Sequence, residues 1–207
     1  MNCNLIKLGI TGGIGSGKSF FSNLLRANGV PVFDSDSEAK KLMVSDESII
    51  FALKALLGDG VYVDGKINKP MLASYIFSSS DNAEKINSIV HPCVKKAFLA
   101  WADECFRSGH NIVAIESAIL FESGFNDIVD KVVMVHAPFE VRVSRVMERD
   151  NTSKEKVMER IKSQMDDERK LSLSDFVIEN DGVKSLEEQT DMLFSGLGRI
   201  KDNQYLV

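Results

Sequence analysis

The chain has 207 residues, of which 44% are hydrophobic and 27% are charged, with a formal net charge of -5 at pH 7. This length allows one sizeable core with inserted smaller lobes, and the composition excludes disorder as the main state. The negative charge excludes a global basic field that recruits nucleic acid, and no apolar run is long enough to span a bilayer, so we expect a cytoplasmic protein without nucleic-acid or membrane partners.

Short apolar runs alternate with amphipathic segments along the chain. The runs that predict strands are residues 4–10, 30–34, 111–117, 130–136 and 175–180. Helical periodicity follows at 18–28, at 37–43, after Pro138 as the first helical residue, and after a capping box of Ser185 and Glu188. Strands that alternate with helices predict an α/β fold, with a five-stranded parallel sheet and helices on both faces.

Two regions do not fit this alternation. Residues 45–109 are long and mostly helical in pattern, and we interpret them as an inserted substrate lobe. Residues 150–172 are strongly charged and poor in apolar residues, which favours a mobile helical lid. The core then consists of residues 1–44, 110–149 and 173–207.

A glycine-rich stretch, GITGGIGSGKSF at residues 9–20, joins the first predicted strand to the first predicted helix. It contains Gly12-x-x-x-x-Gly17-Lys18-Ser19, the phosphate-binding loop pattern in its required context. Glycines let backbone N–H groups face a polyphosphate, and the helix start adds its dipole. Lys18 supplies charge at the β- and γ-phosphates, and the Ser19 hydroxyl is a ligand for Mg²⁺. The loop residues that we expect to bind ATP are Gly13, Gly15, Ser16, Gly17, Lys18 and Ser19.

Two motifs that the sequence lacks indicate which class of nucleotide-binding protein this chain belongs to. Neither the guanine-reading Asn-Lys-x-Asp nor an Asp-x-x-Gly switch is present. This favours a small-molecule kinase, in which the inserted lobe holds the second substrate. A lid that closes over ATP would exclude water and prevent hydrolysis of the γ-phosphoryl group.

Two carboxylates follow the second predicted strand, in FDSDSEAKK. Asp34 and Asp36 are expected at the carboxyl edge of the sheet, where ligands of open α/β sheets bind. A carboxylate there accepts a proton from the hydroxyl of the acceptor or holds a metal-bound water. The alternative is that Asp36 is a helix N-cap, in competition with a capping box of Ser35 and Glu38. We favour Asp36 as the base and Asp34 as its support.

Glu116 ends the apolar run NIVAIE. Phosphate-loop proteins commonly keep an acid at this position that orients Mg²⁺ through water, so Ser19 and Glu116 are the predicted metal site. The alternative is an ordinary polar strand end.

Three arginines, Arg142, Arg145 and Arg149, are predicted on one face of the helix after Pro138. Guanidinium groups there stabilise charge on a transferring phosphoryl group, and we favour Arg145 and Arg149 for that role. The alternative is a solvated face that pairs with Glu148 and Asp150.

The order of these motifs resembles the dephospho-coenzyme A kinase family over nearly the whole chain. The similar segments are GITGGIGSGKS, GVPVFDSD, VHP at 90–92, ILFESG at 119–124, RVMERD, RIKSQM and DFVIEND. The resemblance implies a three-layer P-loop kinase fold. It also implies phosphorylation of the ribose 3'-hydroxyl of 3'-dephospho-CoA by ATP with Mg²⁺, giving coenzyme A and ADP in the last step of coenzyme A biosynthesis.

The same resemblance implies roles for single residues. Asp36 matches the proposed base of the family, His91 matches a residue of the substrate lobe, and Asn180 matches a loop beside the adenine. Lys40 is a candidate for the anionic substrate, although a solvated lysine pair with Lys41 is the alternative.

The sequence departs from the family at two places. Phe20 replaces a small hydroxylated residue, so only its backbone N–H is left for the α-phosphate. Glu116 and Ala118 stand where many members have Asp and Pro, and Glu116 is still long enough to reach a hydrated metal or the substrate.

Two other functions remain as alternatives. The first is a phosphate-loop kinase for a nucleoside monophosphate or a sugar-like alcohol. Kinases for nucleotides need arginines that clamp the acceptor phosphate, and residues 45–106 contain no arginine. The second is a nucleotide-dependent switch, which the Asp-x-Asp pair and the large lobe argue against. The sequence specifies no oligomeric state.

Overall fold

A five-stranded parallel sheet forms the centre of the structure, as the alternation of elements predicts. In this computed structural model, which describes residues 5–203, the strand order is β2-β5-β1-β6-β7. The strands are β1 (Ile6–Thr11), β2 (Val32–Asp34), β5 (Ile112–Glu116), β6 (Lys131–His136) and β7 (Phe176–Glu179). The chain divides into two compact units, residues 1–32 with 105–207 and residues 33–104, with the boundary inside β2.

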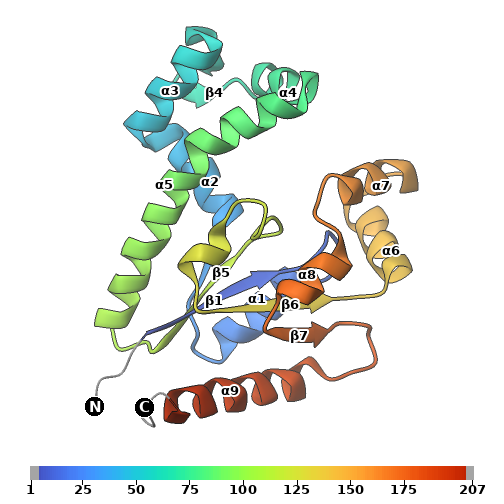
Figure 1. Cartoon of the computed structure of the whole chain (residues 1–207). Helices are drawn as coiled ribbons and strands as arrows, with labels where there is room; N and C mark the ends of the chain where they lie inside the picture. The colour runs from blue at the N-terminus through green and yellow to red at the C-terminus, as the bar shows by residue number, and fades with distance from the viewer. Residues whose placement is uncertain (1–4, 204–207) are drawn as a thin grey trace. The chain divides into compact units, whose positions relative to one another are not determined.

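One face of the sheet is covered by helices α1 (Lys18–Ala27) and α9 (Leu186–Asn203), which lie side by side (Figure 1). Ile10 of β1 is in register with Val133 of β6, and both point into this core. Phe21 of α1 and Leu193 of α9 pack against them. Because alternate strand residues face opposite sides, these β-branched and leucine side chains form one continuous apolar layer.

The other face of the sheet packs against the segment after β5, the short helix η2 (Phe125–Ile128) and helix α8 (Asp167–Leu173). Gly9 lies at the middle of β1, where a Cβ atom would stand 2.7 Å from the Leu120 side chain. The missing side chain therefore lets Leu120, which is fully buried, reach the sheet.

Helices α6 (Phe139–Asp150) and α7 (Lys154–Lys162) contact each other beside the sheet. Pro138 is the N-cap of α6, so the prediction that it is the first helical residue is wrong by one position. Val143 and Val146 form a small cluster with Val157 of α7, which is completely buried. The segment predicted as an apolar-poor lid is thus helical and has an apolar anchor.

The second unit is mostly helical, as predicted for the inserted lobe. Its elements are α2 (Ser35–Ser45), α3 (Glu47–Leu57), η1 (Asp59–Val61), β3 (Tyr62–Val63), β4 (Lys66–Ile67), α4 (Lys69–Ser78) and α5 (Ser80–Arg107), which continues into the first unit. Phe33 contacts Phe98 and Trp101, with ring centroids 5.5 Å and 5.3 Å away. The unit begins before residue 45 because Tyr62 donates a hydrogen bond to the Met43 carbonyl at 2.6 Å, which holds α2 to the hairpin.

Strands β3 and β4 form an antiparallel hairpin that was not predicted from the sequence. Its turn consists of Asp64 and Gly65, with φ angles of +50° and +72°. An Asp-Gly pair between short apolar runs is typical of such turns, so the signal was present in YVDGKI. No helix among residues 5–203 is long and apolar enough to cross a membrane.

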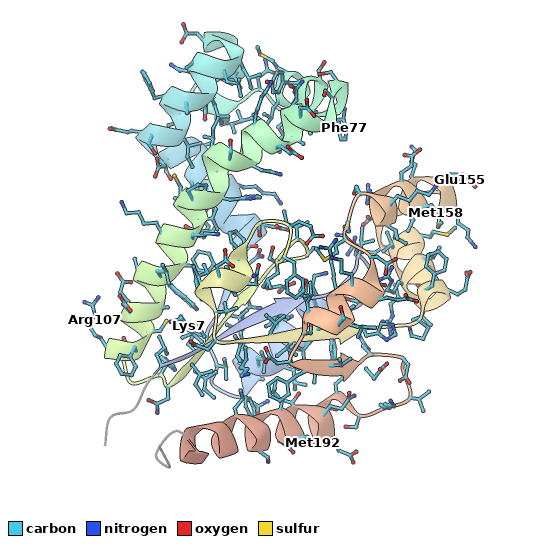
Figure 2. All side chains as sticks on the ribbon, in the orientation of Figure 1. Lys7, Phe77, Arg107, Glu155, Met158 and Met192 are labelled. Atoms are coloured by element: carbon cyan, nitrogen blue, oxygen red, sulfur yellow. The ribbon has the colours of Figure 1, made fainter. Side chains whose placement is uncertain are left out.

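Two neighbouring residues of α9 provide a test of how this helix packs on the sheet. Leu193 is 3% exposed, whereas Met192 is 74% exposed and lies on the outer side of α9 (Figure 2). We expect Leu193→Ala to lower the free energy of unfolding by about 2–5 kcal/mol, because it leaves a cavity in the core. Met192→Ala should change it by less than about 0.5 kcal/mol. Urea unfolding of both variants measures this, and equal stabilities would contradict the packing of α9 on the sheet.

Candidate functional site

The glycine-rich loop between β1 and α1 needs its glycines because other parts of the chain approach it closely. Gly12, Gly15 and Gly17 have φ angles of +148°, +80° and +93°. A Cβ atom at Gly12 would stand 2.2 Å from the Val135 carbonyl oxygen, and one at Gly17 would stand 2.0 Å from Asn180 Nδ2. The loop therefore has a conformation that only glycine adopts without strain.

Lys18 and Ser19 begin helix α1 directly after this loop. Gly17 is the N-cap in a left-handed conformation, without a side-chain cap. The first amides of a helix have no intrahelical acceptor, so together with the helix dipole they favour an anion there. The Lys18 ammonium bends back over the loop and donates to the Gly12 carbonyl at 2.8 Å.

A cavity of about 220 Å³ opens beside the loop and the start of α1. Three cationic side chains line it, Lys18, Arg145 and Arg149. The remaining lining residues are Gly15, Gly17, Ser19, Phe20 and Val146. The protein as a whole is acidic, so this local cluster is what an anionic ligand requires.

Asn180, at the end of β7, connects one of these cations to the loop. Arg145 donates to the Asn180 carbonyl at 3.1 Å, and Asn180 Nδ2 donates to the Ser16 carbonyl at 2.8 Å. The segment that follows the last strand thus supports the loop at a sequence separation of 164 residues.

The second cation of α6 at the cavity, Arg149, already has a counter-ion. Arg149 Nε donates to Asp150 Oδ1 at 2.8 Å, and Arg160 of α7 donates to the other oxygen at 2.7 Å. These two guanidinium groups lower the pKa of Asp150 to about 2. The sequence left open that these arginines pair with acidic neighbours, and the ion pair between Arg149 and Asp150 is present in this structure.

Arg142 does not share the cavity with the other two arginines, which corrects the prediction of one arginine face. It is 2% exposed and pairs with Asp167 of α8. A Cβ atom at Gly13 would stand 2.0 Å from Arg142 Nη1, so this guanidinium lies against the loop backbone. The physical reason is that Arg142 stands at the start of α6, where Asp167 and the loop backbone enclose it, whereas Arg145 and Arg149 stand about one and two turns further along and reach the cavity.

Ser19 and Glu116 lie together, as the strand order requires. β5 is the neighbour of β1 in the sheet, so its carboxyl end faces the start of α1. The Ser19 hydroxyl donates to Glu116 Oε1 at 2.9 Å. The two oxygen ligands predicted from separate parts of the sequence thus form one pair.

Three residues that support the site were not predicted for any role. Gln164 accepts a hydrogen bond from the Ile14 amide at 2.9 Å, Asp167 pairs with Arg142, and Lys170 is completely buried. All three lie in the charged segment that was interpreted as a lid. Charge runs normally indicate a solvated face, and no local pattern marks which members of this run turn inward.

The remaining predicted residues belong to the second unit. Asp34 is the N-cap of α2 and accepts hydrogen bonds from the Ser37 amide at 3.0 Å and hydroxyl at 2.7 Å. Asp36 stands in the first turn, so the alternative of Asp36 as the N-cap is wrong. Burial raises the pKa of Asp34, but the hydrogen bonds of Ser37 and Asp36 and the charge of Lys40 together lower it below its usual value.

His91 lies inside α5, directly before Pro92. Burial lowers the pKa of His91, and the charge of Lys95 lowers it further, so its ring is neutral at pH 7. Lys40 and Lys41 are exposed on α2, and Lys41 pairs with Glu38 at 2.9 Å.

A five-stranded parallel sheet, a glycine-rich loop followed by Lys-Ser, and an acid at the end of the neighbouring strand define a P-loop kinase. The family model for dephospho-CoA kinases matches residues 6–185. The chain belongs to the dephospho-CoA kinase family.

Individual relatives agree with this assignment. A dephospho-CoA kinase of Bacteroides fragilis strain YCH46 is 52% identical over 186 residues, covering 89% of each chain. One from Porphyromonas gingivalis is 47% identical over 170 residues, covering 82% of this chain and 81% of the relative. A solved protein from Thermus thermophilus superposes with a TM-score of 0.78 at 35% identity, covering 95% of this chain and 98% of that one.

The fold is also similar to a dephospho-CoA kinase structure from Campylobacter jejuni. The TM-score is 0.66 at 22% identity, with 94% of this chain and 98% of that chain covered. At this identity the similarity shows that the five-stranded sheet with helices on both sides is shared.

The packing of the loop predicts different effects at two glycines. Gly17 and Gly29 both have positive φ angles, but nothing lies within 4 Å of a Cβ atom at Gly29. Both Gly→Ala variants should lose about 1–2 kcal/mol of stability from backbone strain. Only Gly17→Ala also displaces Asn180, so we expect it to weaken ATP binding about tenfold or more. Calorimetric titration with ATP measures this, and wild-type affinity in Gly17→Ala would contradict the role of the loop.

Proposed function

We propose that this protein transfers the γ-phosphoryl group of ATP to the ribose 3'-hydroxyl of 3'-dephospho-CoA, giving coenzyme A and ADP. The observation that carries the donor half of this proposal is the cavity beside the loop, with Lys18, Arg145 and Arg149 around it. Membership of the dephospho-CoA kinase family supports the acceptor half. Cytoplasmic location and the absence of nucleic-acid and membrane partners stay predictions from composition.

The donor site would hold the triphosphate of ATP by backbone and side-chain groups together. The loop residues Gly13 to Ser19 and the amide of Phe20 would bind the phosphates. Asn180, which donates to the Ser16 carbonyl, would lie beside the adenine. Arg145 and Arg149 would stabilise charge on the transferring phosphoryl group. A triphosphate would compete with Asp150 for Arg149, whose side chain is 63% exposed and is therefore accessible.

The Ser19 hydroxyl and the Glu116 carboxylate fit a magnesium ion. Both are hard oxygen ligands, and their oxygens lie 2.9 Å apart. Among the described residues there is no group of three or more His, Cys, Asp or Glu side chains that could hold a metal alone. Mg²⁺ usually keeps several waters and takes substrate phosphates as ligands, so two protein oxygens suffice. When bound, it would neutralise negative charge on the phosphates.

Asp36 is the proposed base for the acceptor. The 3'-oxygen attacks the γ-phosphorus, its proton passes to Asp36, and the bond to the oxygen that bridges the β- and γ-phosphates breaks. Asp34 is less suited to this step, because its oxygens accept hydrogen bonds from Ser37 and its lowered pKa makes it a weaker base. Asp34 is therefore assigned to support, as the N-cap that shapes the first turn of α2.

His91, Lys40 and Glu116 are proposed contacts for dephospho-CoA. A neutral His91 offers one donor and one acceptor nitrogen to the substrate, and Lys40 offers a positive charge to its phosphates. The helical lid, residues 150–172, would exclude water from the transferring group.

A coupled assay of ADP release over a panel of acceptors tests the proposal. Turnover should depend on dephospho-CoA, and nucleoside monophosphates and sugar-like alcohols should give much less. Turnover that needs no acceptor would favour a nucleotide-dependent switch, and preference for another acceptor would favour a different small-molecule kinase.

Two matched variants separate the roles of the aspartates. Asp36→Asn should lower kcat by about 100-fold or more, because the general base is lost, with ATP affinity unchanged. Asp34→Asn should lower kcat less, because Asn is also a good N-cap and keeps the first turn of α2. Steady-state kinetics and ATP titration of both variants give the comparison. A larger loss in Asp34→Asn than in Asp36→Asn would reverse the assignment.

A further inference from the structure

Lys170 is a lysine with no exposed surface, in the last turn of α8. Burial of an ammonium group costs several kcal/mol unless oxygen atoms compensate for the lost water. An apolar residue at this position would pack at lower cost, and replacement of buried ion pairs by apolar residues is often neutral or stabilising. Stability alone therefore gives little reason for a charge here.

The partners of Lys170 lie in the segment that follows β5. Its ammonium donates to the Ala118 carbonyl at 2.7 Å and pairs with Glu122 Oε1 at 3.2 Å. Glu122 Oε1 also accepts a hydrogen bond from the Met165 amide at 2.7 Å, just before α8. Residues 118–122 are thus held to both ends of α8, and the attachment begins two residues after Glu116.

The same helix contacts the phosphate-binding loop through other residues. Asp167 pairs with the buried Arg142, whose guanidinium lies against Gly13. Gln164, just before the helix, accepts the hydrogen bond of the Ile14 amide. Asp167 and Lys170 are three residues apart and therefore lie on the same side of α8. The helix connects the loop to residues 118–122, which follow Glu116 in the chain.

We propose that Lys170 is a positioning residue, which sets the place of Glu116 relative to Ser19 by fixing the segment after β5 onto α8. This inference rests on the proposed function, because the Ser19–Glu116 pair matters to the reaction only if it holds a metal for phosphoryl transfer. Lys170 is completely buried, so it acts through its own contacts within the protein. Its effect passes through the Ala118 carbonyl and Glu122.

The test compares Lys170→Met with Lys156→Met, the same change at an exposed lysine of α7. Methionine keeps most of the buried volume and removes the charge. In Lys170→Met, amide hydrogen exchange of residues 117–124 should rise about tenfold, with exchange in β6 and α9 unchanged. We expect kcat to fall about 10- to 100-fold, because a displacement of catalytic groups by about 1 Å has effects of this size. Lys156→Met should leave amide exchange of residues 117–124 at the wild-type rate.

A double variant separates positioning from the cost of an unpaired carboxylate. If Lys170→Met acts only by leaving Glu122 unpaired, Lys170→Met/Glu122→Gln should recover wild-type kcat and exchange, and this outcome would overturn the proposal. If Lys170 positions the segment, kcat should stay low and exchange of residues 117–124 should stay high. Faster exchange across the whole chain in Lys170→Met would also overturn it, because it would indicate general destabilisation.

Hydrogen exchange needs no turnover, so the two proposals fail in distinguishable ways. Wild-type protein without dephospho-CoA-dependent turnover would contradict the proposed function. Unchanged exchange of residues 117–124 in Lys170→Met would contradict the positioning role whatever the acceptor is.

Discussion

The close contact of other chain segments with the phosphate-binding loop is the constraint on which the rest of the first unit depends. There is no space for a Cβ atom at Gly12, Gly13 or Gly17, because Val135, Arg142 and Asn180, respectively, occupy that space. Contacts within the chain therefore fix the shape of the loop. Preorganised donors need no reorganisation when charge develops, which is the usual source of electrostatic catalysis.

The charged groups of the donor site already have partners within the protein. Lys18 donates to the Gly12 carbonyl, Ser19 donates to Glu116, and Arg149 pairs with Asp150. These contacts hold each side chain near the place where the proposed substrate and metal would need it. The cations pair with the Gly12 carbonyl, which is uncharged, and with Asp150, whose side chain is partly exposed. A triphosphate with several negative charges would therefore compete for the cations at modest cost.

The charged segment after α6 contains two helices, α7 and α8, that are attached to the rest of the first unit in different ways. Its first helix, α7, has Val157 as its one completely buried residue. Its second helix, α8, is fixed by the ion pairs of Asp167 and Lys170. In the proposed closure over ATP, α7 would move, and the motion would end where α8 is attached.

The sequence by itself determined the elements whose signals are local. The spacing from Gly12 to Ser19, the apolar runs of the five strands and the acid at the end of β5 predicted the parallel sheet, the loop and the Ser19–Glu116 pair, because parallel strands bring their carboxyl ends to one edge. Only the tertiary structure decided that Arg142 turns inward, that Asn180 supports the loop and that Lys170 is buried. These contacts join residues 25 to 164 positions apart. A charged or polar residue has no local pattern that shows whether a distant partner will compensate for its burial.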